Sequence, residues 1–132
     1  QIFNVSTSHE IDAAFATFLR ERPDVLFAVG DPLFASRRVQ LANLAARHLL
    51  PSAFAQREIA EVGGLMSYGS SLGDAWRQAG VYAGRILKGE KPADLPVQQV
   101  TKVELIINLK SAMALNLILP QSLIARADEV IE

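Results

Sequence analysis

Apolar and polar residues follow two periods along this chain, one typical of helices and one typical of strands. The opening run "QIFNV" predicts a strand. Residues 7–10, "TSHE", then have the capping-box spacing of a helix start. The apolar residues that follow recur at the spacing of one helical face, up to Pro23: Ile11, Ala14, Phe15, Phe18 and Leu19. We therefore expect a strand followed by an amphipathic helix.

The next segment repeats this order. "DVLFAVG" is a short, continuously apolar run of the kind found in a strand that is covered on both faces of a parallel sheet. A second helix is predicted from about Ala35, with an inner face of Leu41, Leu44, Ala45, His48 and Leu49. Pro51 then precedes a third strand, "SAFA".

The remainder of the chain continues the alternation. "GLMSYG" predicts a strand, and "LGDAWRQAGVYAGRILKG" predicts the longest helix, which stops at Gly89. Its apolar face is expected to hold Leu72, Trp76, Ala79, Ala83, Ile86 and Leu87. "GEKPADLPVQQ" indicates a surface linker before the strand "KVELIINL", and the tail predicts a short helix, a proline break and a final helical turn. The expected fold class is α/β, an open, doubly wound and mainly parallel sheet.

Composition narrows the class of protein. The chain has 132 residues, of which 50% are hydrophobic and 20% charged, as expected for one globular domain or part of one. A net charge of −1 without a basic stripe argues against nucleic acid as a partner. The absence of cysteine excludes disulfides and thiolate chemistry. The most apolar runs, "VLFAV" and "LIINL", are too short to cross a bilayer.

The candidate site follows from the expected fold. Ligands of doubly wound sheets bind outside the carboxyl ends of the strands. Four stretches that combine polar and aromatic residues follow predicted strands, at residues 6–8, 31–34, 56–58 and 67–71. This mixture is typical of a small-molecule cleft, in which rings supply contact area and polar groups fix orientation.

Each candidate residue also has a purely structural interpretation. Asp31 can cap a turn, and Ser70 or Ser71 can cap the long helix, although a capped helix start can hold a carboxylate as well. Arg57 can pair with Glu58 or Glu61 instead of a ligand. Phe34 and Tyr68 can belong to the core. Tyr68 is the better cleft candidate, because the serines and glycine around it offer little to bury it.

Catalytic interpretations have weaker support. "LMSYG" has Leu65 where a nucleophile elbow needs glycine, and both histidines, His9 and His48, precede Ser67. They are far apart, so neither a triad nor a zinc pair is expected. Glycine-rich nucleotide loops are absent from the sequence. We expect no catalytic residue, no metal site and no cofactor.

Longer motifs resemble a known family. "SYG", "RQAGVYAGRILKGEKPADLPVQQVTKVELIINLK" and "PQSLIARADEVIE", with "IDAAFATF" and "DPLFASRR" upstream, resemble the substrate-binding proteins of ABC transporters, of the tryptophan/tyrosine type. The resemblance covers essentially the whole chain. It implies a type I periplasmic-binding-protein fold, with two hinged lobes that close on a solute.

Less than half of such a protein is present. The abrupt start on "QIFNV" agrees, and we expect that Gln1 is not a natural start and that the amino-terminal lobe is missing. Residues 1–132 would then be a carboxy-terminal portion. Within it, about 1–62 would form one lobe, about 63–90 the crossover and a helix of the other lobe, and about 91–132 the return strand and terminal helices.

The resemblance implies a non-enzymatic solute receptor of an importer, located in the periplasm or otherwise outside the cytoplasm, with a membrane permease as partner. The expected solute is an amino acid or a related carboxylate, bound by Asp31, Phe34, Arg57, Ser67, Tyr68 and Ser71. Asp31 would take an ammonium group, the 67–71 turn a carboxylate, and Phe34 or Tyr68 an apolar side chain. Family members often have an aromatic pair near Gln56 and Arg57, whereas here the nearest aromatic is Phe54. The alternatives are a ligand-sensing regulatory domain of the same fold and, more weakly, a serine hydrolase that uses Ser67.

Overall fold

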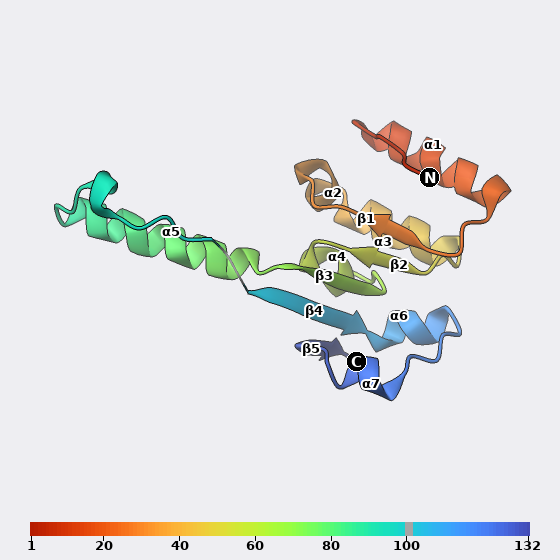
Figure 1. Ribbon diagram of the computed structural model, residues 1–132. Coiled ribbons are helices and arrows are strands. Elements are labelled where there is room, and N and C mark those ends of the chain that lie inside the picture. The colour runs from red at the N-terminus through yellow and green to blue at the C-terminus, as the bar shows by residue number, and fades with distance from the viewer. Residues whose placement is uncertain (100–101) are drawn as a thin grey trace. The chain divides into compact units, whose positions relative to one another are not determined.

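The computed structural model describes residues 1–99 and 102–132. Its centre is a five-stranded sheet of order β1-β2-β3-β4-β5 (Figure 1). The strands are β1 (Leu26–Ala28), β2 (Ser52–Phe54), β3 (Met66–Ser70), β4 (Val103–Asn108) and β5 (Glu129–Ile131). Strands β1, β2 and β3 run parallel, as do β4 and β5. The expected α/β class with a mainly parallel sheet is confirmed.

Strand β4 runs against β3. The N–H of Asn108 donates to the carbonyl of Leu65 at 2.9 Å, and the N–H of Ser71 donates to the carbonyl of Lys102 at 3.0 Å. Residue numbers therefore increase in opposite directions along the two strands, so β3 and β4 are antiparallel.

The helices connect the strands in the predicted alternation. They are α1 (Ser8–Glu21), α2 (Pro32–Ser36), α3 (Arg38–Arg47), α4 (Arg57–Glu61), α5 (Leu72–Leu87), the short 3-10 helix η1 (Pro92–Asp94), α6 (Leu109–Ala114) and α7 (Gln121–Ile124). The start of α1 confirms the capping box, because the Thr7 hydroxyl accepts the N–H of Glu10 at 3.2 Å. The Glu10 carboxylate in turn accepts the N–H of Ser6 at 2.6 Å.

The chain divides into two compact units. Unit 1 holds residues Gln1–Gly69 and Glu104–Glu132, and unit 2 holds Ser70–Val103. The core of unit 1 joins Ile11 and Phe15 of α1, Leu41 of α3 and Phe54 of β2, each at most 3% exposed. Unit 1 therefore has its own hydrophobic core.

The expected strand at the amino terminus is wrong. Residues Gln1–Val5 belong to no strand, and the sheet order begins at β1. Phe3 and Val5 nevertheless pack against the core, and the Phe3 ring meets Phe18 edge-on at 4.9 Å, while Ile2 is 88% exposed. The segment has the alternation of a strand without a neighbouring strand to pair with.

Two further expectations need correction. The helix predicted from Ala35 is two helices, since Asp31 starts α2 and the backbone of Arg37 separates α2 from α3. Leu49 lies after α3 with a φ of 50° and is 64% exposed, so it is not on the inner face. The short helix, the proline break and the helical turn expected in the tail are present as α6, Pro120 and α7, while helix α4 and strand β5 were not expected. Helices α2 and α4 have five residues each, too few to show a helical period in the sequence.

Strand β1 is covered on one face only. Ala28 is 7% exposed, but Phe27 is 59% exposed, and Val25 and Val29 beside the strand are each 61% exposed. The apolar run "DVLFAVG" correctly predicted a strand, yet the expected cover on both faces is wrong for the described chain.

Unit 2 consists of the predicted long helix and the segment that follows it. Ser71 caps α5, and Gly89 follows its end with a φ of 103°. None of the residues of α5 is buried, and Trp76 and Leu87 on its apolar face are 74% and 87% exposed. The linker returns alongside the helix, where the Tyr82 hydroxyl donates to the carbonyl of Pro96 at 2.6 Å.

Glu90 provides a pH prediction for unit 2. Arg85 Nε donates to both of its oxygens, at 3.0 and 2.9 Å, and these hydrogen bonds hold the pKa of the Glu90 carboxyl below its ordinary value. Because the pKa of Glu90 is lower in the folded state than in the unfolded state, the Arg85–Glu90 pair stabilises the fold at pH values above the ordinary pKa of glutamate. That stabilisation disappears as the pH falls through the lowered pKa. An NMR titration should show the low value, and Arg85→Gln should return it toward the ordinary one; an unchanged Glu90 titration would contradict the contact.

Candidate functional site

The carboxyl ends of β1 and β2 lie in one row with Ser67, the second residue of β3. Ala28 pairs with Phe54, and Phe54 pairs with Ser67, so the segments that follow β1 and β2 emerge beside the carboxyl-terminal part of β3. This edge carries five of the six predicted site residues, Asp31, Phe34, Arg57, Ser67 and Tyr68. Ser71 belongs to unit 2.

Asp31 lies in the loop after β1 and is exposed. Its carboxylate accepts the N–H of Leu33 at 2.7 Å, which caps α2. The carbonyl of Asp31 accepts a hydrogen bond from Gln56 Nε2 at 3.1 Å, and this bond ties the loops after β1 and β2 together. The turn interpretation is therefore confirmed, and the exposed carboxylate still faces solvent.

Gln56 was not among the predicted site residues. Its Oε1 is a buried side-chain atom with no hydrogen-bond partner among the residues that the structure describes. Since buried acceptors are nearly always satisfied, this atom marks a local departure from ideal packing at the same edge. The sequence offered no signal for it beyond its place after a strand.

Residues 67–70 do not form the predicted turn, because they continue strand β3. Gly69 is required there: a Cβ at this position would lie 2.0 Å from the carbonyl oxygen of Ala55. The glycine serves the close approach of two backbone segments, which is a common reason for glycine within a strand.

The strand geometry separates Ser67 from Tyr68. Successive residues point to opposite faces of a sheet. Ser67 is 2% exposed on the covered face, while Tyr68 is 61% exposed on the other. Ser67 is therefore inaccessible as a nucleophile or a direct ligand contact in this structure, whereas the tyrosine ring is open to a ligand.

Ser71 acts as the predicted cap of the long helix. Its hydroxyl accepts the N–H of Asp74 at 3.4 Å and the residue is 7% exposed. Within the same unit, Lys102 Nζ lies 3.6 Å from the carboxylate of Asp74. The helix start is thus held by a serine and an ion pair.

Phe34 is partly buried against the core of unit 1, as its structural interpretation predicted. The ring of Phe34 therefore contributes to the stability of unit 1. Phe54, the aromatic residue nearest to Gln56 and Arg57 in the sequence, is 0% exposed and forms part of the same core. It presents no ring face to a solute.

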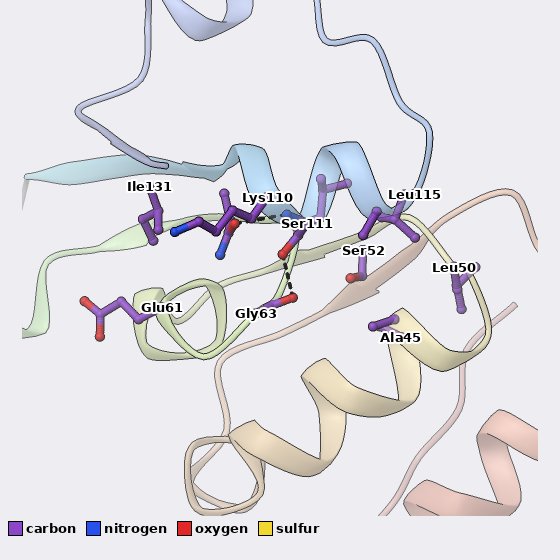
Figure 2. Close-up of a pocket in the computed structure, with 13 residues that line it drawn as sticks. Ala45, Leu50, Ser52, Glu61, Gly63, Lys110, Ser111, Leu115 and Ile131 are labelled. Atoms are coloured by element: carbon purple, nitrogen blue, oxygen red, sulfur yellow. Dashed lines mark hydrogen bonds between the residues drawn. The ribbon is translucent and has the colours of Figure 1, made fainter.

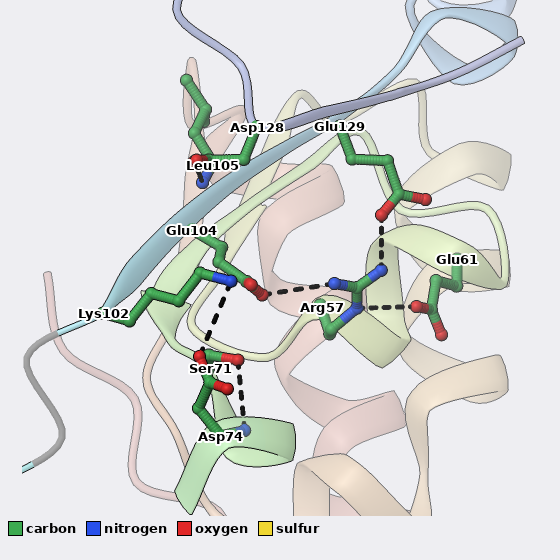
Figure 3. Close-up of polar contacts among 9 residues, drawn as sticks. All are labelled: Arg57, Glu61, Ser71, Asp74, Lys102, Glu104, Leu105, Asp128 and Glu129. Atoms are coloured by element: carbon green, nitrogen blue, oxygen red, sulfur yellow. Dashed lines mark hydrogen bonds and ion pairs between the residues drawn. The ribbon is translucent and has the colours of Figure 1, made fainter.

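Arg57 lies at the centre of an ion-pair cluster (Figure 3). Its guanidinium is 2.8 Å from Glu61, 3.2 Å from Glu104 and 2.6 Å from Glu129, so the predicted pairing with Glu61 is confirmed and the one with Glu58 is not seen. The hydrogen bonds that it donates to Glu61 and Glu129 raise the pKa of Arg57 above its ordinary value. The cluster joins α4 to β4 and β5, the two strands that come after α5 in the sequence.

A cavity of about 400 Å³ lies at the other end of the same strands (Figure 2). It begins at Ser52 and Leu65, on the amino-terminal side of β2 and β3. Two of its polar groups are engaged within unit 1: the Ser111 hydroxyl donates to the carbonyl of Gly63 at 2.8 Å and Lys110 to the carbonyl of Glu132. The cavity is mostly apolar and distant from Asp31 and Tyr68 along the strands, so it is not part of the candidate site.

Comparison with known proteins identifies the family. The model of the ABC transporter substrate binding protein family matches residues 2–131. The chain belongs to this family, whose members bind solutes and are not enzymes. Together with the burial of Ser67, this excludes the serine hydrolase considered above. None of the curated proteins matches the chain significantly.

Solved structures agree with the fold. The ABC domain from Streptococcus pneumoniae in complex with L-Trp matches with a TM-score of 0.87 and 27% identity, over 99% of this chain and 44% of that one. A conserved domain protein from Vibrio cholerae O1 biovar El Tor matches with a TM-score of 0.81 and 27% identity, over 94% and 42%. The ligand-free, open structure of a substrate-binding protein with adhesive properties from Clostridium difficile matches with 0.63 and 25%, over 96% and 42%.

The chain thus spans less than half the length of these structures. None of the helices in the described part of the chain is both long and apolar enough to cross a membrane.

Proposed function

We propose that this chain is the carboxy-terminal portion of the solute receptor of an ABC importer, and that the full-length protein, this chain with the polypeptide that precedes it, binds a small organic solute between two lobes. The observation that carries the proposal is the family match across residues 2–131 combined with coverage of 42–44% of the similar structures. The periplasm or another extracytoplasmic compartment is the proposed location, and a membrane permease the proposed partner.

Unit 2 supports the division into lobes. An α-helix of 16 residues with no buried residue and an exposed tryptophan lacks the tertiary packing that gives most helices in proteins their stability. We assign α5 to a lobe that the preceding polypeptide completes, and the greater part of unit 1 to the other lobe. The proposed crossovers follow β3 and precede β4, later than the residue 62 boundary expected from the sequence.

The solute is proposed to be an amino acid or a related carboxylate. The exposed Asp31 carboxylate is suited to an ammonium group, and the exposed Tyr68 ring to the apolar part of the solute. Ser71 is 7% exposed and its side chain caps α5, so the backbone of this helix start, and not the serine hydroxyl, is proposed to attract a solute carboxylate. In this proposal, the edge of the sheet is stabilised by Arg57, Ser67 and Phe34, and these three residues do not contact the solute.

A similar structure contains L-Trp, so aromatic amino acids are the first to test. Isothermal titration calorimetry of the full-length protein with the common L-amino acids and small dicarboxylates should give one-to-one binding with a Kd of about 1 μM or tighter for at least one class. Heats of dilution alone across the whole panel would contradict the proposed solute class.

Tyr68→Ala should weaken binding of that solute by about 1–3 kcal/mol. Because Tyr68 is 61% exposed, the melting temperature of the unliganded protein should change little. Calorimetry and thermal melting of the same sample check both parts. Phe54→Ala is the matched control, since this ring is 0% exposed and its loss should lower the melting temperature strongly. A Tyr68→Ala protein that melts far earlier yet binds normally would make Tyr68 a packing residue.

A further inference from the structure

The cavity of unit 1 has the size of a small-molecule site. Its volume is about 400 Å³, within the range of roughly 300–1,000 Å³ that ligand pockets in proteins occupy. Its walls come from the end of α3, the segments that lead into β2 and β3, helix α6 and strand β5, all within unit 1 (Figure 2). Close packing normally leaves voids little larger than a water molecule, so a hollow of this volume is more than a packing defect.

The inner surface of the cavity is mostly apolar. Ala45, Leu50 and Leu65 form its floor and are at most 5% exposed. Leu115 and Ile131 are partly buried and form its walls. An apolar group that enters the cavity would remove these side chains from water, which is favourable. The cavity therefore suits an apolar body of the size of an aromatic ring.

One polar group at the floor lacks a partner. Ser52 lines the cavity and is 2% exposed, and its hydroxyl makes no hydrogen bond with the residues that the structure describes. The neighbouring Asn108 is satisfied, because its amide donates to the carbonyl of Ala60 at 3.0 Å and accepts the N–H of Ser111 at 3.1 Å. Buried hydroxyls nearly always have a hydrogen-bond partner. The partner of Ser52 therefore has to come from the cavity.

The rim of the cavity carries a positive charge. Lys110 is exposed there, donates to the carbonyl of Glu132 and forms no ion pair with the described residues. The acidic residue of the rim, Glu61, lies 2.8 Å from the guanidinium of Arg57, which neutralises its charge. The rim therefore favours a ligand with a negative charge at the end that faces solvent.

We propose that this cavity is a second ligand site, separate from the candidate site at the carboxyl ends of the strands. Its ligand is a small carboxylate with an apolar body and a hydroxyl group at the opposite end. The body fills the apolar floor, the hydroxyl hydrogen-bonds to Ser52, and the carboxylate lies beside Lys110. The inference goes beyond the proposed function and does not depend on which solute binds between the lobes.

The test uses the full-length protein and para-hydroxyphenylacetate, which combines the three features. Methyl NMR locates the bound probe. The methyl signals of Ala45, Leu50 and Leu65 should shift in a saturable way with a Kd on the order of 1 mM, as expected for a ligand of this size. The methyl signals of Leu33, beside Asp31 at the candidate site, should not shift when the solute that calorimetry identifies saturates that site.

Two related probes each lack one polar group. Phenylacetate has no hydroxyl, and it should bind about 3- to 10-fold more weakly, which is the usual contribution of one hydrogen bond. The neutral para-hydroxyphenylacetamide has no charge, and it should bind about 2- to 5-fold more weakly, because Lys110 is exposed and the ion pair is screened by solvent. Equal affinity of the three probes would overturn the assigned ligand class.

Variants assign each contact. Ser52→Ala should reduce the affinity for para-hydroxyphenylacetate to that for phenylacetate, and the melting temperature should not fall, because the hydroxyl that is lost has no partner. Lys110→Gln should reduce the affinity for para-hydroxyphenylacetate to that for the amide. A Ser52→Ala or Lys110→Gln protein that binds para-hydroxyphenylacetate as the unchanged protein does would remove that residue from the site and overturn the proposed contacts.

A blocking variant tests the place of binding. Ala114 lies on α6 at the exposed rim, so Ala114→Trp should abolish the shifts while the melting temperature stays nearly unchanged. Met113→Trp is the matched control, since Met113 is 67% exposed on the same helix and does not line the cavity. Absence of saturable shifts at the floor would mean that the cavity holds only water and would overturn the inference. Failure of every amino acid to bind would instead count against the proposed function alone.

Discussion

Gly69→Ala is expected to destabilise the full-length protein by about 3 kcal/mol or more. The new Cβ would lie 2.0 Å from the carbonyl oxygen of Ala55 and 2.9 Å from its carbonyl carbon, and both are backbone atoms that cannot rotate away. Strands β2 and β3 would have to separate at the edge that carries Asp31 and Tyr68. Solute affinity should therefore fall together with stability.

Gly30→Ala is the matched control for this substitution. Gly30 lies in the loop after β1 at the same edge, and the nearest atom to its added Cβ would be Ala55 Cβ at 3.7 Å, an ordinary contact. Urea unfolding of both variants should show a lower midpoint for Gly69→Ala and almost no change for Gly30→Ala. Equal midpoints would show that the close approach of the two strands is not a constraint in solution.

Arg57→Met is expected to cost about 2 kcal/mol of unfolding free energy. Two of the three carboxylates around Arg57, those of Glu61 and Glu129, are 43% and 48% exposed, and pairs of this kind contribute little. Most of the effect comes from Glu104, whose side chain is 11% exposed and which loses a cationic partner. Methionine keeps much of the arginine stem, so the change tests charge more than packing.

A double-mutant cycle isolates this contact. Glu104→Gln in the Arg57→Met background should restore part of the lost stability, because the buried charge is removed together with its partner. Arg85→Met, which breaks an exposed pair with Glu90, should lower the unfolding midpoint much less than Arg57→Met does. Additive effects of the Arg57 and Glu104 substitutions would contradict a direct contribution of this ion pair.

Local patterns predicted the elements that carry a full period. The capping box placed the start of α1 correctly, and the apolar runs predicted β1, β2, β3 and β4. Helix α5 followed from its apolar spacing, although its apolar face is exposed in this chain. These signals lie within a few residues of one another in the sequence, which is why they could be recognised.

Features that depend on distant residues could not be predicted. Arg57 meets Glu104 and Glu129, which are 47 and 72 residues away in sequence. The segment 67–71 has the serines and glycine of a turn, but Gly69 is there because Ala55 of another segment approaches it closely. The segment "QIFNV" has the pattern of a strand, but a strand forms only where a neighbour supplies the other half of each hydrogen bond.

The candidate site was predicted at the level of the sheet edge. Asp31 and Tyr68 are exposed there, as a contact residue must be. Successive residues of β3 point to opposite faces of the sheet. Ser67 is buried and Tyr68 is exposed because the core covers the face to which Ser67 points. The sequence alone does not contain that choice.

Small-angle X-ray scattering of the full-length protein, with and without the solute that calorimetry identifies, tests the central claim most directly. A two-lobe receptor that closes on its solute should become more compact, with a smaller radius of gyration at saturating solute and no change with a non-binding amino acid. An unchanged radius of gyration in a sample in which calorimetry confirms full occupancy would contradict the account.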